Sequence, residues 1–260
     1  YGTPPPKMLT PLTDDLDSVS EKLFAITING GSEHCGQAIQ AAVSSLSWSN
    51  NSDDLKVIFI AGNEPFTQGS VDYRDACKAA ITRGIIVNTI HCGDESTGIN
   101  TKWKDGALLA EGRFMNINQN QKIVHIESPH DSQLIQLNNE LNTTYIAYGA
   151  TGRESAARQM MQDSNAMSLS AESAINRAAT KTSGQYRNSN WDLVDAYKEG
   201  KVTIKDLKKE DLPEIMREMT DHQQGEYIKQ QQVKRNDIQA KIKSLTKARN
   251  EYVASKRKEM

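Results

Sequence analysis

Residues 55–63, LKVIFIAGN, are the stretch that decides the fold. The six residues from Leu55 to Ile60 are apolar except for one lysine, which is typical of a strand buried on both faces of a sheet. The small and polar residues that follow end this strand. Residues 85–90, IIVNTI, predict a second buried strand, and residues 113–117 predict a third.

Helices are predicted between these strands. Residues 72–83 place their apolar side chains on one helical face and are followed by Gly84, a common helix terminator, and residues 103–111 predict another helix. The order strand, helix, strand, helix, strand predicts a parallel sheet with right-handed helical crossovers. Ligands bind such open sheets at the carboxyl ends of the strands, so residues that follow the strands are the first candidates for a site.

Apolar residues are concentrated in the first part of the chain. Residues 1–148 are therefore predicted to form an α/β domain and residues 149–260 a polar, helical region. Within that region, residues 155–181 predict one helix, and residues 226–260 predict a long one because neither Gly nor Pro interrupts them. The apolar stripe of the long helix, between Ile238 and Tyr252, is narrow, as on a solvated helix, and is a candidate for self-association.

Composition limits the classes of partner. The chain has 260 residues with 31 Lys and Arg against 33 Asp and Glu, so its formal net charge is −2. This balance lacks the basic excess typical of a nucleic-acid-binding protein. No apolar run approaches the roughly 20 residues that span a bilayer. Three cysteines are too few for a disulfide scaffold.

The tripeptide His-Cys-Gly occurs twice, beginning at His34 and at His91. The second copy follows a strand and the first opens a helix, so Cys35 and Cys92 are expected near one rim of the sheet. Four interpretations of this pair stay open. They are two small half-buried side chains; a disulfide, which requires an oxidising compartment and Cα atoms within about 7 Å; a zinc site with both histidines; and a cysteine–histidine nucleophile.

Four stretches together resemble the von Willebrand factor type A (VWA) domain family, in particular bacterial VWA domain-containing proteins. They are residues 10–16 (TPLTDDL), 29–33 (NGGSE), 57–65 (VIFIAGNEP) and 84–90 (GIIVNTI). The resemblance covers about residues 7–148 and implies a Rossmann-like, mostly parallel sheet with flanking helices. The match begins at the family's third strand, so the first two strands and first helix of the family are expected to be missing from this chain.

The resemblance also implies a site at the rim of the sheet. Many type A domains hold a divalent metal, usually Mg²⁺, on an Asp-x-Ser-x-Ser loop, a Thr and a strand-end Asp. Ser32 matches the Thr position and is the predicted metal ligand. The strand-end Asp is absent and no Asp-x-Ser-x-Ser occurs, so the metal-ion-dependent adhesion site is predicted to be degenerate. Glu33, Asn63 and Glu64 complete the predicted binding rim.

The predicted function is a non-catalytic protein-binding or assembly module that presents this rim to a protein partner. No glycine-rich phosphate loop follows a strand, and no acid–base pair stands out, so the chain is not expected to be an enzyme. The alternatives are a thiol-based redox protein that uses Cys35 and Cys92, and a purely structural envelope domain. The resemblance suggests the bacterial periplasm or cell envelope, with the cytoplasm as the alternative.

Overall fold

The computed structural model describes residues 6–27, 31–118 and 125–259. Its chain forms two compact units. Unit 1 comprises Tyr1–Leu12 and Thr27–Val124, and unit 2 comprises Thr13–Ile26 and His125–Met260. These bounds differ from a division at residue 148, because the first helix and the segment after residue 124 group with the helical region. Asn29 and Gly30, which belong to the stretches that resemble the VWA family, lie outside the described residues.

Unit 1 contains a small parallel sheet with the strand order β1-β2-β3. The strands are β1 (Lys56–Gly62), β2 (Ile85–Cys92) and β3 (Phe114–Ile117). The register places Gly62 beside His91 and Cys92 beside Ile117. The predicted parallel α/β arrangement is therefore confirmed for three strands, whereas the Rossmann-like VWA type stays a prediction.

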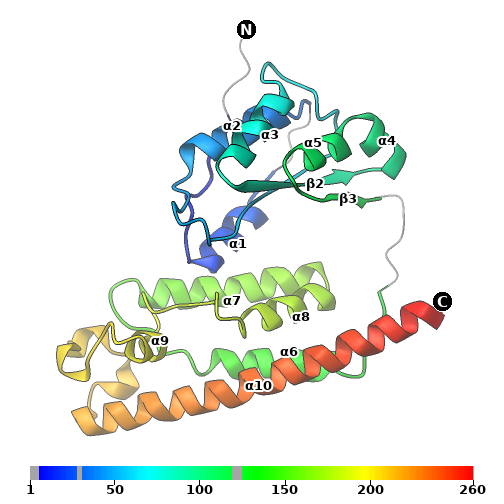
Figure 1. Ribbon diagram of the computed structural model, residues 1–260. Coiled ribbons are helices and arrows are strands. Elements are labelled where there is room, and N and C mark those ends of the chain that lie inside the picture. Colours follow the sequence, from blue (N-terminus) through cyan, green and yellow to red (C-terminus); the bar gives the residue numbers. More distant parts are fainter. Residues whose placement is uncertain (1–5, 28–30, 119–124, 260) are drawn as a thin grey trace. The chain divides into compact units, whose positions relative to one another are not determined.

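Helices cover one face of this sheet in unit 1 (Figure 1). They are α2 (Cys35–Ser45), α3 (Tyr73–Thr82), α4 (Glu95–Asn100) and α5 (Trp103–Leu109). Apolar side chains of α2, α3 and α5 form one core with the β2 residues Ile85 and Val87. On the opposite face, Phe59 of β1 is 66% exposed, so the prediction that this strand is buried on both faces is wrong. The physical reason is that, among the described residues of unit 1, helices pack on one face of the sheet and none packs on the face that carries Phe59.

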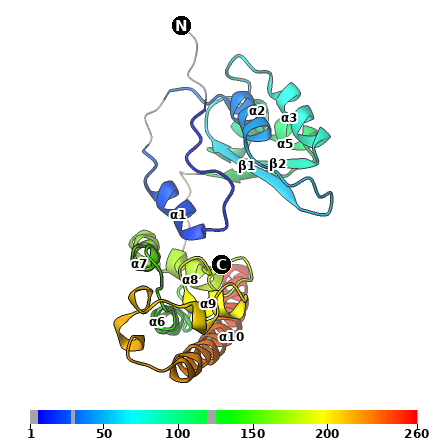
Figure 2. The same ribbon diagram turned by 90° about the vertical axis from the view of Figure 1, so that its left-hand side faces the viewer.

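Unit 2 is helical (Figure 2). Its helices are α1 (Leu16–Phe24), α6 (Asp131–Asn142), α7 (Gly152–Leu169), α8 (Ala171–Thr180), α9 (Leu193–Lys198) and α10 (Asp221–Glu259). Three short 3-10 turns, η1 (Ile204–Asp206), η2 (Lys209–Asp211) and η3 (Glu214–Met216), precede α10. The single helix predicted over residues 155–181 is two helices, because Ser170 is extended and its side chain caps α8 by accepting from the N–H of Ser173.

Two apolar clusters hold unit 2 together. One joins α6 and α8 to Ile238 and Ile242 of α10, and the other surrounds α9 and Ile228. The apolar stripe of α10 was predicted to be solvated or to serve self-association. Its first two residues, Ile238 and Ile242, instead pack inside unit 2. Among the described helices, none has the length and apolar character needed to cross a membrane.

Candidate functional site

The carboxyl end of β1 is closed by the Glu33 side chain. Its Oε2 accepts from the backbone N–H groups of Asn63 at 2.8 Å and Glu64 at 3.1 Å. Gln68 Oε1 accepts from the N–H of Glu33 at 2.8 Å. A Cβ at position 62 would overlap the Glu33 carboxylate, so a larger residue there would displace this side chain from its position. The structure thus brings together three of the four predicted rim residues. The Glu33 carboxylate accepts hydrogen bonds from the backbone N–H groups of Asn63 and Glu64.

Ser32, the fourth predicted rim residue, is exposed. The adjacent carboxylate of Glu33 faces N–H donors rather than an open coordination position. In the part of the chain that the structure describes, no three His, Cys, Asp or Glu side chains are grouped to hold a metal ion. Mg²⁺ requires near-octahedral oxygen ligation, so the described rim does not fit this ion, and coordination by Ser32 stays a prediction.

His91 is buried at the carboxyl end of β2, where it is 1% exposed. Its ring is tilted against that of Trp103, with the ring centroids 5.8 Å apart. Asn116 Nδ2 lies 3.5 Å from His91 Nδ1 and donates to the Gly93 carbonyl at 2.8 Å. His91 therefore packs inside unit 1. Its Nε2 is buried and has no hydrogen-bond partner among the described residues.

All three cysteines are free thiols in the structure. Burial, with a smaller effect from nearby Glu33, raises the pKa of Cys35 to about 12. Burial also raises the pKa of Cys77 to about 11, and its Sγ donates to the Gly106 carbonyl at 3.4 Å. Both thiols are protonated at neutral pH, and a protonated thiol is a poor nucleophile. The pairing of Cys35 with Cys92 stays a prediction.

Thiol alkylation tests this environment. In native protein, iodoacetamide is expected to modify half-buried Cys92 first, with Cys35 and Cys77 slower by about 100-fold or more because they react only after local opening. The measurement is a time course followed by mass spectrometry, with urea-unfolded protein as the control in which all three react. Equal rates for Cys35 and Cys92 in native protein would contradict the burial. A Cys35–Cys92 link in non-reduced protein would support the disulfide.

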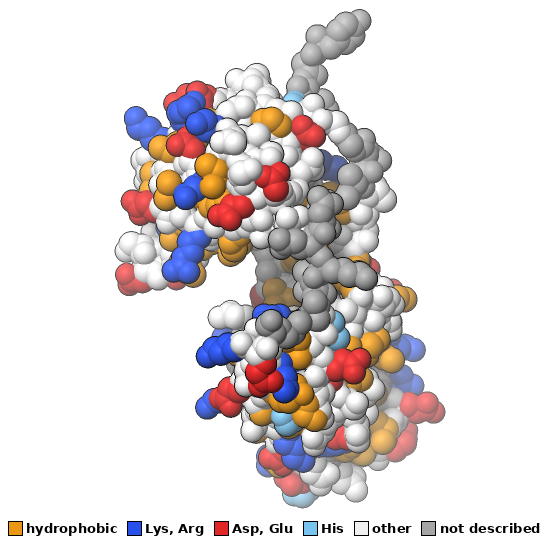
Figure 3. Space-filling view, turned by 90° about the vertical axis from the view of Figure 1, so that its right-hand side faces the viewer, with side chains coloured by type: hydrophobic (Ala, Val, Ile, Leu, Met, Phe, Trp, Pro, Cys, Tyr) orange, Lys and Arg blue, Asp and Glu red, His pale blue; other side chains and the backbone are white. Residues whose placement is uncertain are grey.

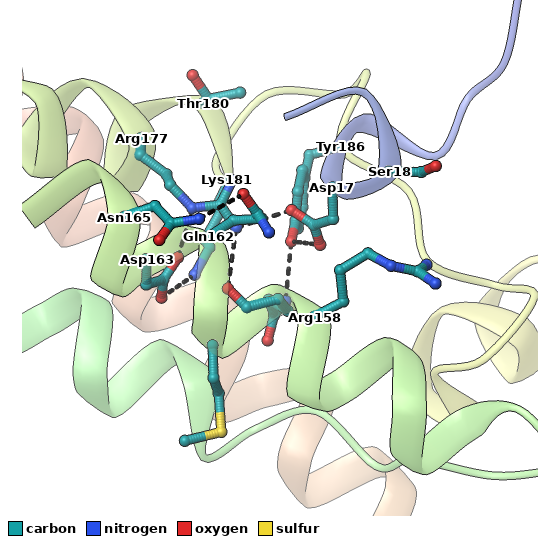
Figure 4. A network of polar contacts seen from close by, with 12 residues as sticks. Asp17, Ser18, Arg158, Gln162, Asp163, Asn165, Arg177, Thr180, Lys181 and Tyr186 are labelled. Carbon is teal, nitrogen blue, oxygen red and sulfur yellow. Dashed lines mark hydrogen bonds and ion pairs between the residues drawn. The ribbon is translucent and has the colours of Figure 1, made fainter. Parts of the chain in front are cut away.

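Unit 2 contains a buried ionic network that no pattern in the sequence indicates (Figure 4). Arg177 of α8 donates through Nη2 to Asp17 Oδ1 of α1 at 2.7 Å, and through Nε to Asp163 Oδ1 of α7 at 2.5 Å. Lys181 Nζ donates to Asp163 Oδ2 at 2.5 Å. Tyr186 OH donates to Asp17 Oδ2 at 2.7 Å. Two carboxylates and two cations thus balance each other.

Lys181 shows how deeply this network is buried. It has no exposed surface. Burial lowers its pKa to about 8, although Asp163 beside it favours the charged form. The amide of Asn142 shares in the network, with its Oδ1 accepting from Lys181 at 2.8 Å and its Nδ2 donating to Asp163 at 2.7 Å. The arrangement joins α1, α6, α7 and α8 through charge-assisted hydrogen bonds.

Arg235 of α10 forms a second buried cluster. Its Nη1 donates to Asp192 Oδ2 at 2.6 Å and to Asp195 Oδ1 at 2.8 Å. Its Nε donates to Thr144 Oγ1 at 3.0 Å, and its Nη2 to the Thr144 carbonyl at 2.7 Å and Asp192 Oδ1 at 3.2 Å. The guanidinium also lies over the Tyr145 ring, 4.1 Å from its centroid. All five N–H groups of Arg235 are occupied, so this cluster fixes helices and leaves no donor on Arg235 for a ligand.

A cavity of about 410 Å³ lies beside this cluster. Residues of α9, α10 and the segment after α8 line it, including Asp195 and Arg235. Arg187, Lys198 and Lys243 also line it, and none of them forms an ion pair within the described residues. Its volume is in the range of ligand pockets, but two of its charged lining groups, Asp195 and Arg235, already bind each other.

No family model, curated protein or solved structure matches this chain. The VWA relation therefore stays a prediction from four short stretches of sequence.

Proposed function

We propose that this protein is a non-catalytic protein-binding module, and that unit 1 docks a partner on the uncovered face of its sheet. The observation that carries the proposal is Phe59, which is 66% exposed in the middle of β1. Parallel sheets in proteins are normally covered on both faces. Within the described residues of unit 1, helices cover one face of the sheet, so the other face offers an apolar surface that a partner protein is suited to cover.

The register defines this surface. Residues paired across parallel strands point to the same face, and alternate residues along a strand do so too. The apolar residues of the open sheet face are Val57, Phe59, Ala61, Ile86, Ile90, Met115 and Ile117, and the same face also carries Asn88, which pairs with Phe59, and Cys92. Ile117 is 49% exposed at its far edge. Contiguous apolar surface of this kind is typical of protein interfaces, and exposed aromatic residues often carry much of their binding energy.

The surrounding surface suits a protein partner rather than a polyanion. On the face of the molecule drawn in Figure 3, Lys and Arg side chains alternate with Asp and Glu on both units. This agrees with the formal net charge of −2. The rim residues Asn63 and Glu64 directly follow β1, so they supply polar groups at one end of the open sheet face.

Site-specific photo-crosslinking tests the proposal. A benzophenone amino acid at position 59 is expected to give one discrete heterologous adduct in the native host, because the side chain there contacts the partner. The same label at Lys78, exposed on the outer side of α3, is the matched control and is expected to give none. Absence of any adduct at position 59, or the same adducts at both positions, would contradict docking on this face.

The substitution Phe59→Ser separates binding from stability. The free energy of unfolding is expected to change by no more than about 0.5 kcal/mol, because Phe59 is already mostly exposed. Affinity for the crosslinked partner is expected to fall about 30-fold or more, as for an aromatic interface anchor. Binding is measured by calorimetry with purified partner, and equal affinities for both proteins would contradict the role of Phe59.

A further inference from the structure

Helix α1 lies in unit 2, although the chain on both sides of it belongs to unit 1. Leu12 and Thr27 are assigned to unit 1, and Thr13–Ile26 between them is assigned to unit 2. The chain therefore passes between the units at residues 12–13, at residues 26–27 and again near residue 125. Without α1 docked in unit 2, only the last of these connections remains.

Charged side chains attach α1 to the rest of unit 2. Asp17, 3% exposed, accepts from Arg177 and from Tyr186. Arg158 of α7 pairs with Asp15 and with Glu21, each at 3.3 Å. Figure 4 shows Asp17 beside Tyr186 where α1 meets α7 and α8. Three carboxylates of the α1 segment thus meet two arginines of unit 2.

Apolar side chains contribute little to this attachment. Leu16, Val19 and Leu23 form one stripe along α1, at spacings of three and four residues. None of them packs against either apolar cluster of unit 2. Leu23 is 61% exposed and Phe24 is 41% exposed. Helix α1 therefore buries the acidic side chain of Asp17, half-buries Leu16 and Val19, and leaves Leu23 and Phe24 exposed.

This kind of attachment favours local opening. Exposed ion pairs contribute little to stability, and the Coulombic gain of buried ones is offset by desolvation. Helices α6, α8 and α10 share an apolar cluster, which α1 does not join. A helix of nine residues is not stable alone in water, so undocking and unfolding of α1 are one event.

We propose that α1 is a releasable clasp: it undocks from unit 2 while the other helices stay folded, and its release frees unit 1 from two of its three connections to unit 2. The inference is independent of partner binding on the open sheet face. It assigns a conformational role to the ion pairs that Asp15, Asp17 and Glu21 form. All three carboxylates belong to α1 or to its N-cap.

Native-state hydrogen exchange of the full chain tests the clasp. Arg158→Gln removes two ion pairs, and because Arg158 is partly exposed it leaves no isolated buried charge. Amides of α1 are expected to exchange about fivefold faster or more, while those of α6, α8 and α10 keep their rates. Asp17→Asn leaves Arg177 with one carboxylate. This substitution is expected to speed up amide hydrogen exchange in α1 by about 100-fold or more. Arg153→Gln, exposed on the same helix α7, is the matched control and leaves α1 unchanged.

Two outcomes would overturn the inference. One is exchange of α1 at the same rate as α10 in the unmodified protein, since α1 would then open only with all of unit 2. The other is an unchanged α1 rate in Arg158→Gln, a variant that keeps the test valid even where Asp17→Asn does not fold.

Discussion

Replacing Arg235 by methionine is expected to lower the free energy of unfolding of unit 2 by about 3–5 kcal/mol. Methionine keeps the apolar stem of the side chain but removes all five hydrogen bonds of the guanidinium. Asp192, which has no exposed surface, and half-buried Asp195 would then lie without a cation. The loss is expected to be larger than for an ordinary surface ion pair, because a buried carboxylate without a partner is strongly destabilising.

The effect is measured by urea unfolding of protein that carries ¹⁹F-labelled tryptophan, monitored by ¹⁹F NMR. The Trp191 signal reports unit 2 alone, because Trp48 and Trp103 lie in unit 1. Lys234→Met is the matched control. Lys234 is the preceding residue, it is exposed, and within the described residues its amine donates one hydrogen bond, to Thr143 Oγ1 at 3.1 Å. Its change is expected to stay within about 0.5 kcal/mol. A loss below about 1 kcal/mol in Arg235→Met would show that the cluster is not the anchor of α10 that its geometry indicates.

Replacing Trp103 by alanine is expected to lower the free energy of unfolding of unit 1 by about 3–5 kcal/mol. Trp103 has no exposed surface and meets Phe66 edge-on, with the ring centroids 4.9 Å apart. Its Nε1 donates to the Glu64 carbonyl at 2.8 Å. The substitution therefore opens a cavity beside the buried His91 and removes a hydrogen bond to the segment that follows β1.

The ¹⁹F signal of Trp48 reports unit 1 in this variant. Trp103→Phe keeps most of the volume and loses the hydrogen bond, so its effect is expected to be smaller, about 1–2 kcal/mol. Leu108→Ala on the same helix α5 is the control, because Leu108 is 66% exposed. Near-equal losses in Trp103→Ala and Leu108→Ala would contradict the placement of Trp103 at the centre of the core of unit 1.

The rim of the sheet was predictable in part. Because Asn63 and Glu64 directly follow a strand, the general rule for parallel sheets placed them at its carboxyl end. Glu33 was predicted from the family resemblance, because it follows Ser32 in the stretch that resembles a rim loop of type A domains. The sequence did not indicate that its carboxylate would bind the N–H groups of Asn63 and Glu64, which depends on how α2 packs against β1.

Helix α10 shows where reasoning from residue type fails. Arg235 and Arg249 follow Ile228 and Ile242 at intervals of seven residues, and all four are buried on one side of the helix. Arginine in a polar helix normally indicates a solvated face. These two are buried because carboxylates distant in the sequence reach them: Asp192 and Asp195 for Arg235, and Asp131 for Arg249.

By itself, the sequence determined the parallel strands, their helical crossovers and the polar helical region, because apolar side chains that recur every two or every three to four residues are local signals. Only the tertiary structure decided which charges meet. Asp17 and Arg177 are 160 positions apart, and Asp192 and Arg235 are 43 apart. An ion pair depends on proximity in space and leaves no periodic trace in the chain, so the ion pairs that attach α1 and those that hold Arg235 of α10 follow only from how the helices pack.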